Sequence, residues 1–146
     1  MLDAFEHLWS QGINVRCVFV GREGWKVRDL TRRIRQHKEW GRRLIWLDRV
    51  SDDELTSLYK GTRAVIVAAK AEGFGLSVVE ALFHQKPLVL RDIPVFREIA
   101  GNGAFYFTGA DAEGLSQPCS MRCVATSFRK RYARLRGPKV SISFSK

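Results

Sequence analysis

An apolar run that leads directly into two closely spaced glycines constrains this chain more than any other feature. Residues 64–69 read AVIVAA and have the length and the β-branched content of a buried strand. The next segment, EGFGLSVVEAL at 72–82, contains Gly73 and Gly75 and then continues from Leu76 with apolar spacing and no helix breaker. The sequence therefore predicts a strand, a tight glycine turn and a helix in immediate succession.

This strand, turn and helix would form a binding site for an anion with hydroxyl groups on both sides. Glycines let the backbone approach a ligand closely, and the first amides of the new helix favour negative charge. Glu72 lies at the strand end and Glu80 about a turn and a half into the helix. Carboxylates repel phosphate and accept hydrogen bonds from neutral hydroxyls. Phosphate flanked by hydroxyls is the chemistry of a nucleotide sugar.

The same residues resemble a known family. Glu72 and Glu80, separated by seven residues around GFGLS, are similar to the Glu-x7-Glu signature of retaining, family-four-type glycosyltransferases of the GT-B fold. The segments 91–101 (RDIPVFREIAG) and 104–107 (AFYF) also resemble the strand, helix and strand that follow in that family. The resemblance covers roughly residues 1–115 and rests on several motifs in the family's order and spacing. It implies the carboxy-terminal, donor-binding domain of a group 1 glycosyltransferase, in truncated form.

The resemblance also implies roles for individual residues. The amides of Phe74, Gly75 and Leu76 would hold the donor diphosphate. Glu72, the predicted catalytic residue, would bind the sugar hydroxyls, and Glu80 the ribose hydroxyls. Two loops at the carboxyl ends of other strands complete the expected site, because ligands of open α/β sheets bind at that end. The expected nucleotide-binding residues are Gly21, Arg22, Val50, Phe74, Gly75, Leu76, Ser77 and Glu80, and no metal ligand is expected.

Strand and helix patterns alternate through most of the chain. Strands are predicted over 14–20, 43–48, 64–69, 87–90 and 104–107. Helices are predicted over 1–11, 26–40 and 94–100, and another begins at a capping box formed by Ser51 and Glu54. This alternation predicts an α/β fold, a Rossmann-like parallel sheet with helices on both faces. By the resemblance it is one half of a GT-B fold whose first strand is missing.

The last thirty residues differ in character from the rest. We expect residues 1–115 to form an incomplete nucleotide-sugar-binding domain and 116–146 a basic tail, disordered or frame-shifted. The tail holds eight of the 25 Lys and Arg residues and no acidic residue. Three interpretations compete: a basic arm for nucleic acid or membrane, a metal clip through Cys119 and Cys123, or translation in a shifted frame. The last is favoured, since the distant histidines leave the cysteines without further metal ligands.

Composition restricts the remaining alternatives. A chain of 146 residues can bury one ordinary core, and no apolar run approaches the length of a bilayer span. The three cysteines make no disulfide framework, so Cys17 is expected to be an inert buried thiol and the setting cytoplasmic, at most peripheral at the inner membrane face. The G-x-G-x-x-G of dehydrogenases and the G-K-[ST] of phosphate-loop NTPases are absent.

The expected function follows from the resemblance. The chain would be the donor-binding half of a retaining glycosyltransferase of bacterial polysaccharide assembly, similar to mannosyl- or rhamnosyltransferases. Its partners would be a GDP- or UDP-linked sugar, as substrate and not cofactor, and an amino-terminal acceptor domain. Without that domain we expect no activity. The alternative is a non-catalytic fragment or binding module whose basic tail contacts nucleic acid or a membrane.

One residue departs from the family pattern at a helix end. Gln85 stands where the family commonly has a glycine that ends the helix. Either a left-handed backbone at this position costs the residue about 1 kcal/mol, because it carries a side chain, or the turn is rearranged.

Overall fold

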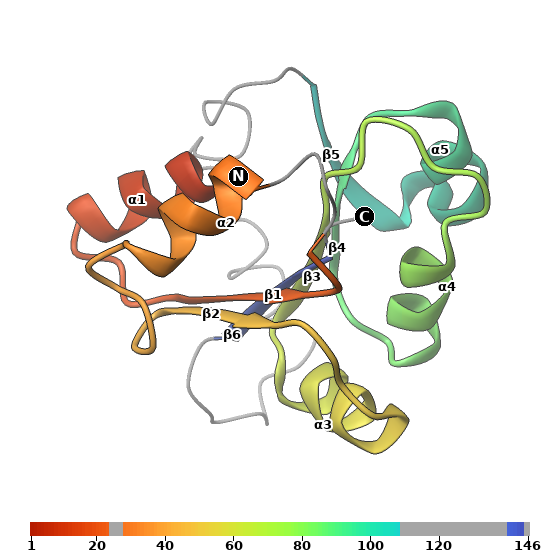
Figure 1. The fold of residues 1–146 in the computed structure, drawn as a ribbon. Coiled ribbons are helices and arrows are strands. Elements are labelled where there is room, and N and C mark those ends of the chain that lie inside the picture. The colour runs from red at the N-terminus through yellow and green to blue at the C-terminus, as the bar shows by residue number, and fades with distance from the viewer. Residues whose placement is uncertain (24–27, 109–139, 145–146) are drawn as a thin grey trace.

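The protein is an α/β domain built on a single parallel sheet (Figure 1). The computed structural model describes residues 1–23 and 28–108 and the strand at 140–144. This architecture confirms the predicted fold class, a Rossmann-like sheet with helices on both faces. The elements are α1 (Leu2–Ser10), β1 (Arg16–Val20), α2 (Arg28–Arg35), β2 (Leu44–Leu47), α3 (Asp52–Gly61), β3 (Ala64–Val67), α4 (Leu76–Phe83), β4 (Leu88–Arg91), α5 (Pro94–Ala100), the 3₁₀ helix η1 (Gly101–Gly103), β5 (Ala104–Phe107) and β6 (Val140–Phe144).

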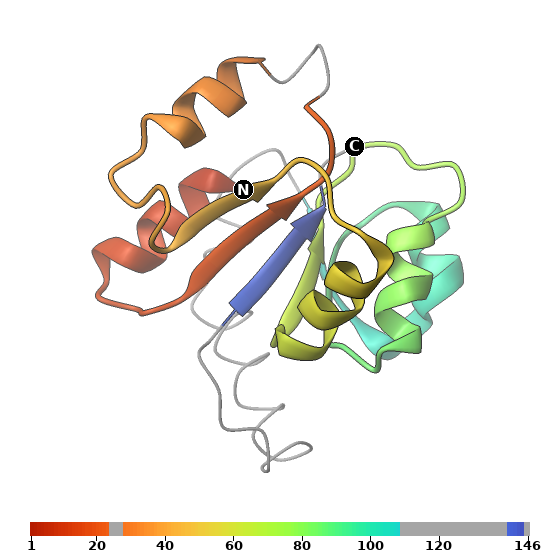
Figure 2. The same cartoon turned by 60° about the horizontal axis from the view of Figure 1, so that its bottom comes forward.

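The strands are arranged in the order β2-β1-β6-β3-β4-β5, and every neighbouring pair is parallel. Doubly wound sheets have the order 3-2-1-4-5-6, in which the first strand of the chain occupies the third position. Here that position belongs to β6, the last strand. Figure 2 shows β6 between β1 and β3.

The position of β6 corrects two expectations from the sequence. The place of the missing first strand is occupied, and Val140–Phe144 is part of the sheet and not of a disordered tail. The segment reads VSISF, an apolar and polar alternation with two β-branched residues, which is typical of a strand and was obscured by the basic residues before it. The rest of the predicted tail lies outside the described residues.

Helices cover both faces of the sheet. On one face, α1 and α2 pack against strand residues that include Cys17, Phe19 and Ile66. On the other, Val65, Val67 and Leu90 contact residues of α3, α4 and α5. Each buried strand thus contributes side chains to both faces, as expected for a parallel sheet. Cys17 is fully buried, and burial raises the pKa of its thiol, which confirms the prediction of an inert residue.

Two helix predictions have different outcomes. The capping box is confirmed, because Ser51 Oγ accepts from the Glu54 N–H and the Glu54 carboxylate accepts from the Ser51 N–H. The helix predicted over 26–40 is shorter and ends at Arg35. Past its end, His37 Nδ1 accepts a hydrogen bond from the Glu39 N–H at 3.1 Å, a local contact that competes with continued helix. Of the helices in the described ranges, none has the length and apolar character to cross a membrane.

Candidate functional site

The predicted site residues lie on segments that follow the carboxyl ends of three strands. Gly21 and Arg22 follow β1, Val50 follows β2, and the segment 72–77 follows β3. The carboxyl ends of parallel strands meet at one edge of a sheet, where ligands of α/β proteins bind. The structure therefore brings all three segments to the edge that the sequence indicated.

Gly75 is the residue that this site requires most strictly. It is the N-cap of α4, is buried, and has a left-handed backbone with φ of 63°. A Cβ atom built there would lie 2.6 Å from Cδ1 of Ile99 on α5. The left-handed conformation is strained for a residue with a side chain, and a Cβ would require the terminal methyl group of Ile99 to move, so glycine lets α4 begin close against α5.

Main-chain amides at the start of α4 form an anion cradle, which we define as the amides of Phe74, Gly75, Leu76 and Ser77. The carbonyl of Gly75 already accepts from Val78 and Val79, at 2.9 and 3.2 Å. The amides of the first helical residues, Leu76 and Ser77, have no intrahelical acceptor because of their position, and the helix dipole favours an anion beside them. The cradle has the chemistry to hold a phosphate group.

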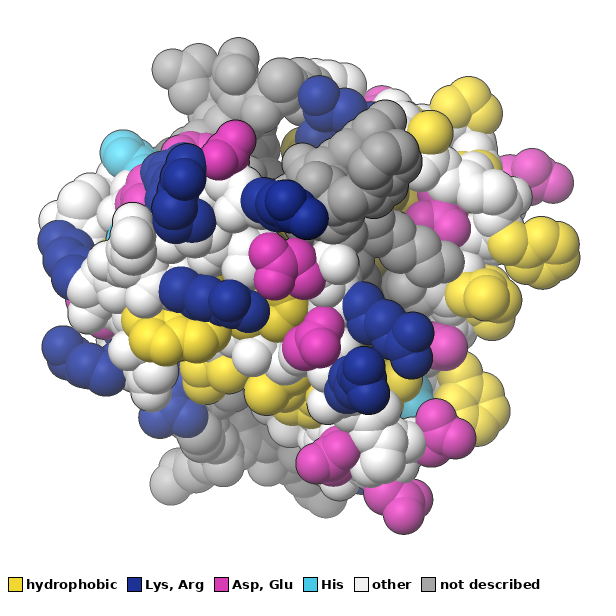
Figure 3. All heavy atoms as spheres, viewed as in Figure 1, with side chains coloured by type: hydrophobic (Ala, Val, Ile, Leu, Met, Phe, Trp, Pro, Cys, Tyr) yellow, Lys and Arg dark blue, Asp and Glu magenta, His cyan; other side chains and the backbone are white. Residues whose placement is uncertain are grey.

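Large hydrophobic side chains are exposed at the cradle and along α4. Phe74 is 77% exposed and Leu76 is 52% exposed, and Val79, Leu82 and Phe83 of α4 are exposed as well. Figure 3 shows hydrophobic side chains on the side of the molecule that carries α4 and α5. The cradle is thus a polar main-chain site beside an apolar helix face.

Glu80 has a partner that the sequence did not indicate. Its Oε2 accepts a hydrogen bond from the hydroxyl of Tyr59 at 2.9 Å. Tyr59 lies on α3, and its ring stacks on the imidazole of His84 with centroids 4.7 Å apart. In the sequence Tyr59 was one residue of an apolar stripe with Leu55 and Leu58, and only the tertiary structure shows that its hydroxyl reaches α4.

Glu72 lies between β3 and α4, as predicted. It is partly buried and interacts with another part of the chain. The beginning of the same loop is tied to β4, because Arg91 Nε donates to the carbonyl of Ala68 at 3.0 Å. Glu72 thus occupies a segment anchored at both ends, by this contact and by Gly75.

The two remaining predicted segments, at Gly21 and Arg22 and at Val50, differ in the groups that can contact a ligand. Gly21 uses both backbone groups to tie β1 to β2: its N–H donates to Leu47 at 3.0 Å and its carbonyl accepts from Trp46 Nε1 at 2.8 Å. The Gly21 amide is therefore not free for a ligand, whereas the side chain of Arg22 is exposed. Val50 is half-buried and packs against Val18 and Val20. It can contribute an apolar contact.

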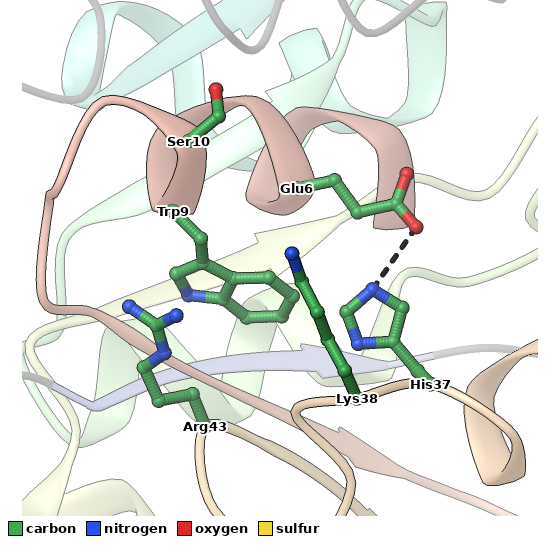
Figure 4. Close-up of a pocket in the computed structure, with 6 residues that line it drawn as sticks. All are labelled: Glu6, Trp9, Ser10, His37, Lys38 and Arg43. Atoms are coloured by element: carbon green, nitrogen blue, oxygen red, sulfur yellow. Dashed lines mark ion pairs between the residues drawn. The ribbon is translucent and has the colours of Figure 1, made fainter.

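A separate cleft of about 250 Å³ lies between α1 and the loop before β2 (Figure 4). His37 Nε2 lies 3.2 Å from Oε1 of Glu6, and Arg43 is bound by Glu39. The last turn of α1 and the start of β2 belong to the amino-terminal edge of the sheet, so this cleft is at the opposite edge from the cradle. Its lining residues are Glu6, Trp9, Ser10, His37, Lys38 and Arg43.

No group of three or more potential metal ligands is close together in the part of the chain that the structure describes. Cys119 and Cys123, considered as a metal clip, lie outside the described residues.

Comparison with known proteins identifies the family. Residues 1–117 match the model for "Glycosyl transferases group 1". The chain belongs to this glycosyltransferase family. Its fold is accordingly the Rossmann-like half of a GT-B glycosyltransferase, which confirms that part of the resemblance.

Curated members of the family show similarity over much of the chain. The serotype-specific mannosyltransferase WbdA of Escherichia coli is 45% identical over 108 residues, which are 74% of this chain and 13% of that protein. A second WbdA from the same species is 44% identical over the same length. The O-antigen chain mannosyltransferase RfbU of Salmonella typhimurium is 38% identical over 69 residues, 47% of this chain and 20% of that protein. The chain thus spans a small part of the length of these relatives.

Proposed function

We propose that this chain is the donor-binding half of a retaining, family-four-type mannosyltransferase of bacterial polysaccharide assembly. Membership of the family implies a nucleotide-sugar donor and an acceptor as substrates. The names of the similar proteins, mannosyltransferases and in one case an O-antigen chain enzyme, support mannose as the sugar and a polysaccharide as the product. They favour mannose over the rhamnose alternative.

Within this proposal the cradle binds the donor diphosphate. Its amides offer hydrogen bonds without a mobile side chain, and the α4 dipole adds to the attraction. Glu72 at the end of the β3 segment accepts hydroxyl groups of the sugar, and Glu80 accepts those of the ribose. Ionised carboxylates only accept hydrogen bonds, which suits hydroxyls and repels phosphate. The alternating order of carboxylate, amides and carboxylate along 72–80 thus matches sugar, diphosphate and ribose.

The same groups would assist the reaction. When the bond from the anomeric carbon to the diphosphate breaks, negative charge accumulates on the departing diphosphate. Fixed amides at the start of α4 stabilise this charge without reorganisation, which is the main contribution of preorganised donors in catalysis. The acceptor hydroxyl attacks the anomeric carbon from the same face of the sugar that the diphosphate leaves. The configuration at the anomeric carbon is therefore retained.

One observation supports this proposal above the others. Gly75 has a φ of 63°, a left-handed conformation that favours glycine, and is the N-cap from which α4 begins after β3, at the ligand-binding edge of the sheet.

Calorimetric titration with GDP and UDP tests the proposal. At least one of these two nucleotides should bind. Glu80→Gln should weaken this binding by roughly 5- to 30-fold, the scale of one or two charge-assisted hydrogen bonds. Asp29→Asn removes one negative charge from α2, on the opposite face of the sheet, and should leave affinity unchanged. Equal losses in the two variants would indicate nonspecific electrostatics, and absence of binding at millimolar nucleotide would contradict the proposal.

A further inference from the structure

The hydrogen bond between Tyr59 and Glu80 joins two helices, α3 and α4, that no sequence motif connects. Tyr59 Oη donates to Oε2 of Glu80 at 2.9 Å. Tyr59 belongs to α3, which follows the β2 loop, and Glu80 belongs to α4, which follows the cradle. The contact therefore links the two segments that flank the expected position of the nucleoside.

Tyr59 is held rigidly. It is 1% exposed and packs with Val65, Val78 and Ala81. One side of its ring stacks on His84, with planes 15° apart. A buried phenol ring with two side-chain torsions has little freedom to move, so the position of its hydroxyl is determined by the core of the domain.

His84 connects this ring to the backbone of Glu80. It is the C-cap of α4, and its N–H donates to the carbonyl of Glu80 at 3.0 Å. Glu80 is thus held at two points. Its carboxylate accepts a hydrogen bond from Tyr59, and its main-chain carbonyl accepts one from His84.

The chemistry of the contact leaves Glu80 able to bind a ligand. Tyr59 donates its single proton, and burial together with Glu80 raises the pKa of the phenol, so the group stays a donor. A carboxylate can accept about four hydrogen bonds. Among the described residues, Tyr59 is the side chain that donates to Glu80, and it does so through Oε2 and not Oε1.

We propose that Tyr59 is a positioning residue, which fixes the Glu80 carboxylate in one orientation and leaves Oε1 to accept hydrogen bonds from the ribose hydroxyls of the donor nucleotide. This inference rests on the proposed function and adds a residue to its site. A glutamate on a helix surface otherwise samples several rotamers, and restricting it beforehand lowers the entropic cost of binding.

Removal of the hydroxyl alone tests the inference. Tyr59→Phe keeps the ring, its burial and its stacking on His84. GDP affinity should fall about fivefold, the scale of one hydrogen bond, while affinity for 2′,3′-dideoxy-GDP, which lacks both ribose hydroxyls, should not change. If UDP is the nucleotide that binds, UDP and 2′,3′-dideoxy-UDP are compared in the same way. In a Glu80→Gln background, Tyr59→Phe should have no further effect.

Tyr106→Phe is the matched control. It also removes a hydroxyl, one that donates to the carbonyls of Phe96 and Gly101 at 3.1 and 2.7 Å and has no contact with Glu80. Its thermal stability should fall, and its preference for GDP over the dideoxy nucleotide should equal that of the unaltered protein.

The outcomes separate the inference from the proposed function. Equal effects of Tyr59→Phe on both nucleotides, or an effect on neither, would overturn the positioning role while the proposed function stands. Failure of the unaltered protein to bind GDP or UDP would overturn both. If Tyr59→Phe does not fold, His84→Ala, which removes the stacked ring and leaves both hydrogen-bonding partners, should show the same selective loss for GDP.

Discussion

At the scale of single residues, Gln85 has the strained backbone, the first of the two alternatives expected from the sequence, and not a rearranged turn. Its φ is 53°, the one positive value of a non-glycine residue in the described ranges. The N–H groups of Gln85 and Lys86 donate to the carbonyls of Leu82 and Ala81, both at 2.9 Å. This is the Schellman pattern, in which glycine is preferred at the position that Gln85 occupies.

Gln85→Gly should therefore stabilise the protein by about 1 kcal/mol, because glycine adopts the left-handed conformation without steric cost. Thermal unfolding followed by circular dichroism measures the change. Gln11→Gly is a matched control: Gln11 is the C-cap of α1 with φ of −83°, so the substitution there should destabilise slightly. A lower melting temperature for Gln85→Gly would show that its side chain makes a contact worth more than the strain.

Glu39 is expected to give the protein an acid-sensitive contribution to stability. Arg43 donates two hydrogen bonds to its carboxylate, at 2.7 and 2.8 Å, and lowers the pKa of Glu39 from its ordinary value of 4.5 to about 2. Since the folded pKa is below the unfolded one, the stabilisation is complete above pH 4.5 and is lost as the pH falls through 2.

Unfolding free energies measured between pH 5 and pH 2 test this contribution. Glu39→Gln should lose less stability over this range than the unaltered protein, because it has no carboxylate to protonate. Arg43→Gln should have a similarly reduced dependence. An identical acid dependence in Glu39→Gln and the unaltered protein would contradict the assignment.

At the scale of elements, most of the sheet could be predicted and its central strand could not. β1, β2, β3, β4 and β5 each lie within or next to a predicted strand, since their apolar runs and flanking turn residues are local signals. The pairing of β6 between β1 and β3 is a long-range contact, which no local pattern specifies. The same distinction applies to the site: the cradle follows from Gly73 and Gly75, whereas the Tyr59 contact depends on how α3 packs beside α4.

β6 should be essential for stability, contrary to the sequence-based expectation that residues 116–146 form a disordered or frame-shifted tail. β1 and β3 each pair with β6 and not with each other, so without it the ladder divides into two parts. Ile142→Pro removes a ladder hydrogen bond donor from a central strand and should cost about 1 to 3 kcal/mol, the scale of leaving the partner carbonyl unsatisfied. Removal of 145 and 146 alone is the control. Unchanged thermal unfolding of Ile142→Pro would contradict the position of β6.

At the scale of the whole molecule, the proposed function requires two abilities, donor binding and sugar transfer, which can be measured separately. Transfer needs the acceptor hydroxyl about 3 to 3.5 Å from the anomeric carbon, and this positioning accounts for much of the rate enhancement. We propose that these 146 residues without an acceptor domain bind the nucleotide and transfer no sugar. A radiolabelled-sugar assay with GDP- and UDP-mannose and lipid-linked acceptors tests this. Turnover by the chain itself would contradict the proposal, whereas turnover only after addition of an amino-terminal domain from a related enzyme would support it.

The most direct test of the central claim is a map of where the nucleotide binds. Amide chemical shifts of ¹⁵N-labelled protein, followed by NMR during titration with GDP or UDP, report on each backbone N–H separately. The cradle hypothesis predicts the largest changes at Phe74, Gly75, Leu76 and Ser77, with smaller changes near Val50 and Glu80. Changes centred on the cleft at Trp9 and Lys38, or spread evenly over the molecule, would contradict it.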